Sequence, residues 1–292
     1  MSWFYKNRWL IGGGLAVAII GTFYLLSRRG TLFSGGVKAD NWIADKNFWM
    51  VGNKDLKTIG KSAGISLSQN KGLGNTLSDS AFKNALARPK VSWAVYDINR
   101  NKLLAQSKNA NTNMYGASVS KAVVVGCAYS KHNGTLPSND DIGKAIRLLV
   151  VSDNSTWNAL TQLAGGDSAV NEFSDRLGLN GMKPAKNKGN SINPIGMCLF
   201  WKDVLQNRFA GAESVFKITS SCQTHASRSR KYLPKTSFVG GKTGTWDGRY
   251  THDSAWLNVG NNWYAISVFS DGSDSSETIA LIFGGLFNQY CK

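Results

Sequence analysis

The order of the predicted elements along the chain is the feature that most constrains its fold. Extended, apolar segments are predicted near both ends, and helical patterns fill the middle, from residue 118 to about 207. The predicted strands cover residues 91–98, 103–106, 238–242, 254–259 and 263–269. An order of this kind is typical of an α/β sandwich, in which one sheet is assembled from both ends of the chain.

Turn and capping residues define several of these boundaries. A helix is expected to begin near Ser78 and to end before Pro89, because the residue before a proline avoids helical geometry. The turns at 99–101 and 260–262 each join two predicted strands into a hairpin. Between two of the central helices lies Gly165-Gly166-Asp167, where Asp167 or Ser168 is expected to cap the second helix. A final helix is expected from about 275 to 287.

An uncharged run of 18 residues, 9–26, lies close to the start of the sequence. At ~1.5 Å per residue a helix of this length reaches roughly 27 Å, close to the thickness of a bilayer core. No small-residue cleavage site follows, so the run is interpreted as an uncleaved transmembrane anchor after a short cytoplasmic segment, 1–8. Basic residues flank the run on both sides and do not orient it.

Residues 27–77 are rich in Gly, Ser, Asn and Lys. This composition predicts a mostly extended basic tether that leads to a catalytic domain at 78–292. The apolar cluster 48–51 interrupts the polar character, as a short docking segment or as a patch that covers part of the domain.

The formal net charge of +16 suits an anionic partner such as lipid headgroups or an acidic envelope polymer. The sequence contains no aromatic-basic RNA motif, zinc-finger spacing or helix-turn-helix pattern, which disfavours nucleic acid.

Three short motifs follow one another: Ser118–Lys121 (SVSK), Ser152–Asn154 (SDN) and Lys242–Gly244 (KTG). Ser-x-x-Lys alone carries little information, since it also begins at Ser68, Ser80 and Ser214. Only Ser118 follows two predicted strands and opens an apolar helical run. Ser-Asp-Asn and Lys-Thr-Gly each occur once. The order and context of the motifs therefore favour a functional set over chance.

The residue types fit nucleophilic catalysis. A serine hydroxyl is a weak nucleophile until a base removes its proton. On a helix, Ser118 and Lys121 are three positions apart and share a face. Lysine can act as the base only when its neutral form is populated, and both burial and a second cation, here Lys242, lower a lysine pKa.

The trio, its order and the flanking elements resemble the penicillin-recognising serine enzymes, and above all the catalytic domain of class A β-lactamases. The resemblance covers residues 78–292 and implies a five-stranded antiparallel sheet flanked by helices, with an all-helical lobe and the active site at their boundary. It implies that Ser118 is the nucleophile, Lys121 its base and Ser152 a proton shuttle. No metal-binding spacing is present, and this serine chemistry needs no cofactor.

The same resemblance assigns substrate-holding roles around the third motif. Asn154 would hold the substrate amide, and the strand of Lys242 would pair with an extended substrate. The backbone N–H groups of Ser118 and Thr245 would form the oxyanion hole. The expected substrate-binding residues are Asn154, Thr243, Gly244, Thr245, Arg249 and His252. For Arg249 and His252, which could bind a substrate carboxylate, placement on the surface is the alternative.

Two departures from the family pattern are visible. Ser152 follows Ser118 by only 34 positions, so the helical lobe should be reduced. The stretch that corresponds to the loop of the deacylating glutamate, 183–190, contains no carboxylate. Acylation is therefore expected, and slow deacylation with it.

Four cysteines occur: Cys127, Cys198, Cys222 and Cys291. Cys127 is expected to be a buried small hydrophobic residue. A Cys198–Cys222 disulfide is one hypothesis for an oxidising periplasm, and two buried thiols are the alternative. His225 and His252 are candidate bases that the lysine system does not require.

The leading interpretation is a membrane-anchored serine hydrolase or acyltransferase that forms an acyl-enzyme with β-lactams or with the D-Ala-D-Ala peptides of peptidoglycan. It would sit in the inner membrane of a bacterium, with the catalytic domain facing the periplasm or the cell exterior. The alternative, from a different class, is a non-turnover binding or structural module of the same fold at the cell envelope.

Overall fold

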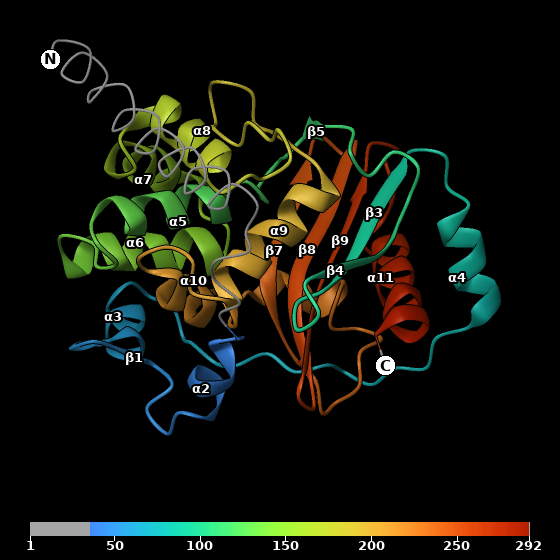
Figure 1. Ribbon diagram of the computed structural model, residues 1–292, viewed down its shortest axis with the longest axis horizontal. Helices are drawn as coiled ribbons and strands as arrows, with labels where there is room; N and C mark the ends of the chain where they lie inside the picture. Colours follow the sequence, from blue (N-terminus) through green and yellow to red (C-terminus); the bar gives the residue numbers. More distant parts are fainter. Residues whose placement is uncertain (1–35, 292) are drawn as a thin grey trace, which may run out of the picture. The chain divides into compact units, whose positions relative to one another are not determined.

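The central sheet has five antiparallel strands in the order β4-β3-β9-β8-β7 (Figure 1). It belongs to a computed structural model that describes residues 36–291. The strands are β3 (Val91–Asp97), β4 (Lys102–Gln106), β7 (Phe238–Trp246), β8 (Tyr250–Val259) and β9 (Asn262–Ser270). The order confirms a sheet built from both ends of the chain, because β3 from the first half pairs with β9 from the second half.

Helices cover both faces of this sheet. On one face α9 (Pro194–Leu205) packs in the core cluster that contains Ala94, Trp256 and Ala265. On the other face α11 (Ser276–Tyr290) packs with Val95 and Ile266. Successive residues of β3, β8 and β9 thus alternate between two cores, as strand geometry requires. Helix α4 (Asp79–Leu86) begins after its cap Ser78, as predicted, and lies beside α11 in Figure 1.

The remaining helices gather beside β7 (Figure 1). They are α5 (Lys121–Lys131), α6 (Asn139–Val150), α7 (Trp157–Leu163), α8 (Gly166–Arg176) and α10 (Ala212–Thr219), with two 3-10 turns, η1 (Asn154–Thr156) and η2 (Gln223–Ser227). Helix α6 is the one helix between α5 and the second motif. The expected cap at Asp167 or Ser168 is wrong: Gly165 takes the N-cap position with a left-handed φ of 98°, which glycine adopts without a Cβ penalty.

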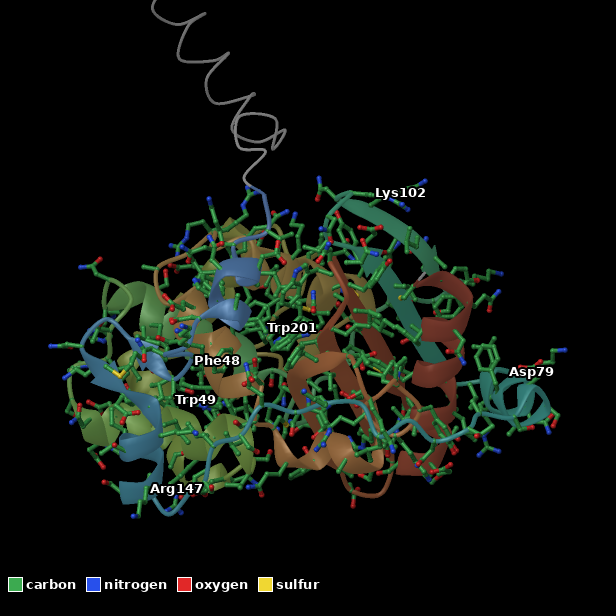
Figure 2. The ribbon with its side chains drawn as sticks, turned by 90° about the horizontal axis from the view of Figure 1, so that it is seen from below. Phe48, Trp49, Asp79, Lys102, Arg147 and Trp201 are labelled. Carbon is green, nitrogen blue, oxygen red and sulfur yellow. The ribbon has the colours of Figure 1, made fainter. Side chains whose placement is uncertain are left out.

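The segment from Val37 to residue 77 is not an extended tether, which corrects the predicted boundary at 77. It belongs to the same compact unit as the rest of the domain, from Val37 onward. It forms α2 (Ala39–Ala44), the hairpin β1 (Met50–Val51) and β2 (Lys54–Asp55), and α3 (Leu56–Ser62). Widely spaced apolar residues, among them Phe48, Leu56 and Leu67, are buried in the main core, and Figure 2 shows Phe48 and Trp49 against the domain.

A buried lysine fixes this segment to the helices. Lys217 of α10 donates from Nζ to the Met50 carbonyl oxygen at 2.6 Å and pairs with Glu213 at 2.6 Å. Its ammonium also lies 5.7 Å from the centroid of the Phe48 ring. The mostly polar composition of residues 27–77 gave no indication of these few contacts.

The predicted cytoplasmic segment 1–8 and membrane anchor 9–26 lie outside the described residues. Within residues 36–291, no helix combines the length and apolarity needed to cross a bilayer.

The predicted Cys198–Cys222 disulfide is wrong, because all four cysteines are free and buried. Cys198 lies between α9 and the sheet, with Sγ 3.5 Å from Ser267 Oγ, and burial raises the pKa of its thiol to about 12. Cys222 lies elsewhere, beside Thr224 at 3.4 Å.

Candidate active site

The nucleophile candidate Ser118 lies in the tight turn that leads into α5. The Ser118 carbonyl accepts from the Lys121 backbone N–H at 3.4 Å, and the preceding Ala117 has a left-handed φ of 46°. A non-glycine residue in this region costs about 1–3 kcal/mol and is found mostly where function requires it. The turn presents Ser118, which is partly exposed, at the N-terminal end of a helix, where backbone N–H groups favour developing negative charge.

The third motif lies directly against this turn. A Cβ placed on Gly244 would lie 3.0 Å from the backbone nitrogen of Ser118 and 3.1 Å from that of Val119. Only glycine therefore allows β7 to approach so closely. The contact brings Thr245, the next residue of β7, beside Ser118, as an oxyanion hole made by these two backbone amides requires.

All three motifs meet at the hydroxyl of Ser152. Lys121 Nζ lies 3.2 Å from Ser152 Oγ and donates to the Ser152 carbonyl oxygen at 2.8 Å. Lys242 Nζ lies 3.1 Å from the same hydroxyl. Asn154 Oδ1 accepts from Lys121 Nζ at 2.5 Å. The structure thus brings together four of the predicted residues, of which both lysine side chains are fully buried.

The second motif is held in an unusual backbone conformation. Ser152 has a left-handed φ of 62°. The following Asp153 accepts from the Ser155 hydroxyl and backbone N–H, at 2.7 and 2.9 Å, and pairs with Arg147 at 2.6 Å. The bonds from Ser155, with Arg147, lower the pKa of Asp153 to about 2. This carboxylate therefore fixes the loop that carries Ser152 and Asn154.

The lysine pair is electrostatically suited to proton transfer. Burial, followed by repulsion from Lys242, lowers the pKa of Lys121 to about 7. Burial also lowers the pKa of Lys242, although negative charge at Cys222 and Asp253 opposes the shift. A lysine with a pKa near 7 has a large neutral fraction at physiological pH, as a general base requires.

Comparison with known proteins agrees with this geometry. A family model described as the β-lactamase enzyme family (Beta-lactamase2) matches residues 141–286, which is half of the chain. The chain belongs to this β-lactamase family. The matched region includes the second and third motifs and begins after Ser118 and Lys121.

Solved structures show the same fold at low sequence identity. A β-lactamase from Chitinophaga pinensis is 19% identical, with a TM-score of 0.59, over 72% of this chain and 96% of that one. An ancestral class A β-lactamase (GNCA) is 18% identical, with a TM-score of 0.60 and the same coverage. No curated protein sequence matches the chain.

One wall of the candidate site is formed by the stretch 183–190, which contains no carboxylate. Within the carboxylate-free stretch 183–190, Lys186 is partly buried and bonds to Asn158 Oδ1 at 2.8 Å. Its ammonium lies 5.4 Å from the centroid of the Trp157 ring, and that of Lys121 lies 4.8 Å from the same centroid. The wall therefore adds positive charge beside Lys121, and the Lys186 charge further lowers the pKa of Lys121. Sequence reasoning gave no signal for Trp157.

Asn190 closes the same wall behind the nucleophile. Its side-chain nitrogen donates to the Ala117 carbonyl at 3.3 Å, and its backbone carbonyl accepts from the Gly116 N–H at 2.6 Å. Asn190 Oδ1 is buried and has no hydrogen-bond partner among residues 36–291. This orphaned acceptor is an unused polar group next to Ser118.

Arg228 is a second residue that sequence reasoning missed, because it stands in a cluster of basic residues, 228–231, of a kind that usually faces solvent. The Arg228 guanidinium is buried and donates to Thr245 Oγ1 at 2.6 Å, to the Gly244 carbonyl at 3.1 Å and to the His252 carbonyl at 2.5 Å. It places a permanent cation beneath the last residues of the third motif. Lys231, by contrast, pairs with Glu277 at the surface.

A buried ionic triad, Cys222, His225 and Asp253, lies beside Thr243 in the third motif. Asp253 lies 3.0 Å from His225 Nδ1, and Thr224 joins Cys222 to Thr243 through hydroxyl contacts. Burial opposes ionisation of Cys222, but the His225 cation outweighs it and lowers the pKa of the thiol to about 6. Burial lowers the pKa of His225, but the charges of Asp253 and Cys222 outweigh it and raise the pKa to about 10. His225 is therefore committed to this ion pair and is not the base for Ser118.

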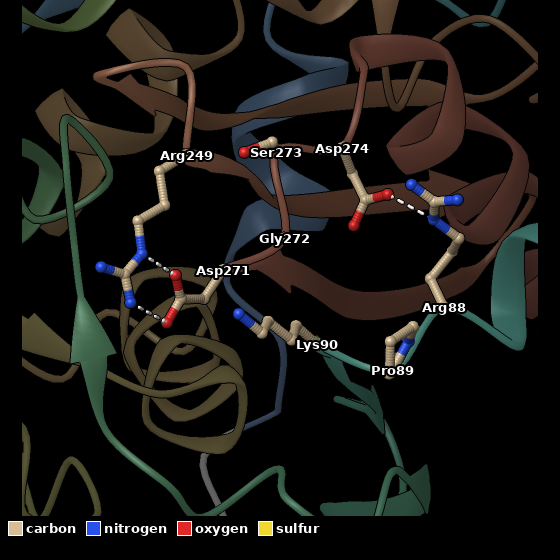
Figure 3. Close-up of a pocket in the computed structure, with 8 residues that line it drawn as sticks. All are labelled: Arg88, Pro89, Lys90, Arg249, Asp271, Gly272, Ser273 and Asp274. Atoms are coloured by element: carbon tan, nitrogen blue, oxygen red, sulfur yellow. Dashed lines mark hydrogen bonds and ion pairs between the residues drawn. The ribbon is translucent and has the colours of Figure 1, made fainter.

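The two tentative carboxylate ligands lie elsewhere. His252 is fully buried, its Nε2 donates to the Tyr115 carbonyl at 2.8 Å, and burial lowers its pKa to about 4. A neutral, buried imidazole does not bind a substrate carboxylate, so that prediction is wrong. Arg249 is exposed in the turn between β7 and β8, where its side chain pairs with both oxygens of Asp271 at one end of a surface pocket (Figure 3). The carboxylate of Asp271 therefore already neutralises the charge of Arg249.

Proposed function

We propose that this β-lactamase-family protein is a serine hydrolase or acyltransferase that forms an acyl-enzyme at Ser118 with β-lactams or with the D-Ala-D-Ala peptides that they mimic. The observation that carries the proposal is the convergence of Lys121 and Lys242 on the hydroxyl of Ser152. Lys121 follows Ser118 by one helical turn. The residues in this arrangement can supply each proton transfer that the reaction needs.

In the first step, neutral Lys121 removes the proton of Ser118 Oγ, and the oxygen attacks the carbonyl carbon. The backbone N–H groups of Ser118 and Thr245 stabilise the charge on the carbonyl oxygen. Charged Lys121 then passes its proton through the Ser152 hydroxyl, 3.2 Å from Nζ, to the leaving nitrogen. The C–N bond breaks and the serine ester remains.

Charge at the site favours anionic substrates. Lys242 and Arg228 lie on and beneath β7, and Lys186 lies on the opposite wall. A carboxylate on the leaving side of the substrate, which β-lactams and D-Ala-D-Ala peptides share, would be attracted to these cations. Arg228 replaces His252 and Arg249 as the residue we propose for this attraction.

Deacylation is the slow step in this proposal. Hydrolysis of the serine ester needs a water molecule and a base on the open side of that ester. The wall that should supply the base offers Lys186 in a stretch without carboxylates. The acyl-enzyme should therefore persist for minutes or longer.

The test is intact-mass spectrometry of the protein after a short pulse of benzylpenicillin, followed over time. We expect a stoichiometric adduct that maps to Ser118 and decays slowly. Absence of any adduct would instead support the second candidate, a non-turnover binding module, which the missing carboxylate favours. Rapid return to the unmodified mass, with excess hydrolysed penicillin, would identify an efficient β-lactamase with another base.

We also propose that residues 9–26 anchor the protein in the inner membrane of a bacterium, with the catalytic domain outside the cytoplasm, where these substrates occur. The 18-residue uncharged run supports the proposal. Deletion of residues 1–30 should move the protein to the soluble fraction without changing penicillin labelling. If the deletion variant stays with membranes and is released only by high salt, the basic surface acts on anionic lipid or polymer instead.

A further inference from the structure

The ring of Trp157 lies against Lys121, and the proposed mechanism assigns it no role. Trp157 is the first residue of α7 and is 6% exposed. The ammonium of Lys121 lies 4.8 Å from its ring centroid, and that of Lys186 lies 5.4 Å from the same centroid. Both distances fall within the ~6 Å over which the face of an aromatic ring attracts a cation. One buried ring therefore serves two lysines.

The indole N–H does not account for this placement. Trp157 Nε1 is buried and has no hydrogen-bond partner among residues 36–291, whereas a buried tryptophan usually finds a partner for this group. A buried donor without a partner costs free energy. The contacts that offset this cost are those of the ring, and they include both ammonium groups.

The hydrogen bonds of Lys121 can be kept in both of its protonation states. Two acceptors, the Ser152 carbonyl oxygen at 2.8 Å and Asn154 Oδ1 at 2.5 Å, take two of its N–H groups. The ammonium has three N–H groups and the neutral amine has two, so neither bond has to break when a proton leaves. Burial, the surrounding charges and the ring therefore decide much of the balance between the two states.

The charges around Lys121 come from several elements. Burial, repulsion from Lys242 on β7 and repulsion from Lys186 on the opposite wall together lower the pKa of Lys121 to about 7. Asp153 acts in the opposite direction, but its carboxylate is also held in an ion pair with α6. The ring of Trp157 favours the charged form without a charge of its own. It therefore offsets part of the repulsion between the lysines.

We propose that Trp157 is a positioning residue for acylation, whose ring holds the Lys121 ammonium that forms when the proton leaves Ser118. The inference rests on the proposed acylation of Ser118 and deepens it. In that step the O–H bond of Ser118 breaks, the oxygen attacks the carbonyl carbon, and the proton moves to Lys121 Nζ. Because the ring attracts the resulting cation more strongly than the neutral amine, it strengthens the base without touching the substrate.

The experiment compares replacements of Trp157 by their pH profiles. Trp157→Leu removes the ring, and Trp157→Phe keeps a smaller ring while leaving a gap of comparable size. Trp93→Leu is the matched control, because this partly buried tryptophan stacks on Tyr290 in the core on the other face of the sheet. Acylation by benzylpenicillin is measured by intact mass from pH 5 to 8 at several concentrations. The ¹³Cε chemical shift of Lys121, assigned with Lys121→Met, is titrated by NMR over the same range.

In Trp157→Leu, the midpoints of the acylation profile and of the Lys121 titration should both fall by about 0.4–1.5 pH units, the effect of an ordinary cation–π contact. The plateau rate should fall roughly 2- to 5-fold, because a weaker base removes the proton less readily. The penicillin concentration at half-saturation should stay within about twofold of the wild type. Trp157→Phe should shift the midpoints by less than half as much, and Trp93→Leu should match the wild type.

Equal shifts in Trp157→Leu and Trp157→Phe, or a midpoint that stays in place in Trp157→Leu, would overturn the role of the ring. A midpoint that rises would also overturn it, since the ring would then act by keeping water from Lys121. The same shift in Trp93→Leu would show a general effect on the fold and reject the inference. If benzylpenicillin does not acylate the wild type, the proposed function fails, and the NMR titration still decides whether the ring holds the ammonium.

Discussion

The two walls of the site beside Ser118 differ in the groups that they offer for proton transfer. On the side that the proposal assigns to acylation (the acylating side), the ammonium groups of two buried lysines meet at the Ser152 hydroxyl, and Gly244 of β7 lies against the backbone of Ser118. On the side where the class A loop should supply a deacylating base, a lysine, a tryptophan ring and an orphaned amide oxygen occur instead. Under the proposed mechanism, ester formation and ester hydrolysis depend on separate groups, and the described residues bring together only the first set.

The largest effect should come from removing the nucleophile. Ser118→Ala deletes the attacking oxygen and nothing that the fold needs, because Ser118 is partly exposed and precedes α5. Covalent labelling by benzylpenicillin should disappear completely while the melting temperature stays within a few degrees of the wild type. An adduct of unchanged yield in this variant would show that another residue is acylated, and the comparison of the two walls beside Ser118 would then lose its basis.

Removal of the base tests the acylating side next. Lys121→Ala should slow acylation by roughly 10²–10⁴-fold, the usual contribution of a positioned general base. The variant also leaves Ser152 Oγ with Lys242 as its remaining lysine partner. Stopped-flow or quenched mass measurements of acylation at pH 7 give the rate. A loss of less than about threefold would move the base to another group.

The pH dependence of the wild type should report the same lysine. The reactive form is the neutral amine, and the pKa of Lys121 is lowered to about 7. The acylation rate should therefore rise with pH, reach half of its plateau near pH 7 and fall to ~1% of the plateau at pH 5, one decade per unit. A flat profile between pH 5 and 8 would contradict a lysine base.

The sequence predicted much of the candidate site because each motif residue carries its own chemistry. Lys121, Ser152, Asn154 and Lys242 meet in the structure, and Ser118 lies one helical turn before Lys121. The sheet was also predictable, since its strands contain β-branched and aromatic residues and several are bounded by turn residues.

The remaining contacts depend on packing that no local pattern encodes. Arg228 reads as one member of a basic surface cluster, yet it is buried against backbone carbonyls. His252 comes shortly after the third motif, a position that suggests a substrate ligand, but it lies in β8, which is buried on both faces. In residues 37–77, a few buried apolar residues such as Phe48 hold the segment against the domain, although its composition is mostly polar.

A change on the incomplete wall should alter hydrolysis rather than ester formation. Lys186→Glu places a carboxylate beside Trp157 and Lys121, and we expect decay of the penicilloyl adduct to accelerate by at least about tenfold, within the range of general-base effects. Because the Lys186 charge lowers the pKa of Lys121, its replacement should also move the acylation profile to higher pH.

Lys188→Glu is the control for that variant, since it makes the same change of charge at an exposed position bonded to Ser168. It should leave both the decay and the profile close to those of the wild type. Equal acceleration in the two variants would indicate a long-range charge effect, and no acceleration in either would mean that the wall lacks more than a carboxylate.

The smallest effect should come from the buried triad behind β7. Cys222→Ser removes the thiolate, which raises the pKa of Lys242 against the larger effect of burial. Without it the pKa of Lys242 falls further, so the alkaline decline of acylation, where Lys242 loses its charge, should begin at lower pH. The plateau rate should change by no more than about threefold, because Ser152 and Lys121 keep their geometry.

Cys198→Ser is the matched control: its thiol has a pKa of about 12 and stays neutral, so no charge is lost. Alkaline limbs that coincide in the wild type, Cys222→Ser and Cys198→Ser would show that Lys242 is insensitive to the triad. An alkaline decline that moves to lower pH only in Cys222→Ser would show that the acylating side includes the Cys222 thiolate. The thiolate would act by keeping Lys242, which contacts Ser152, in its charged form.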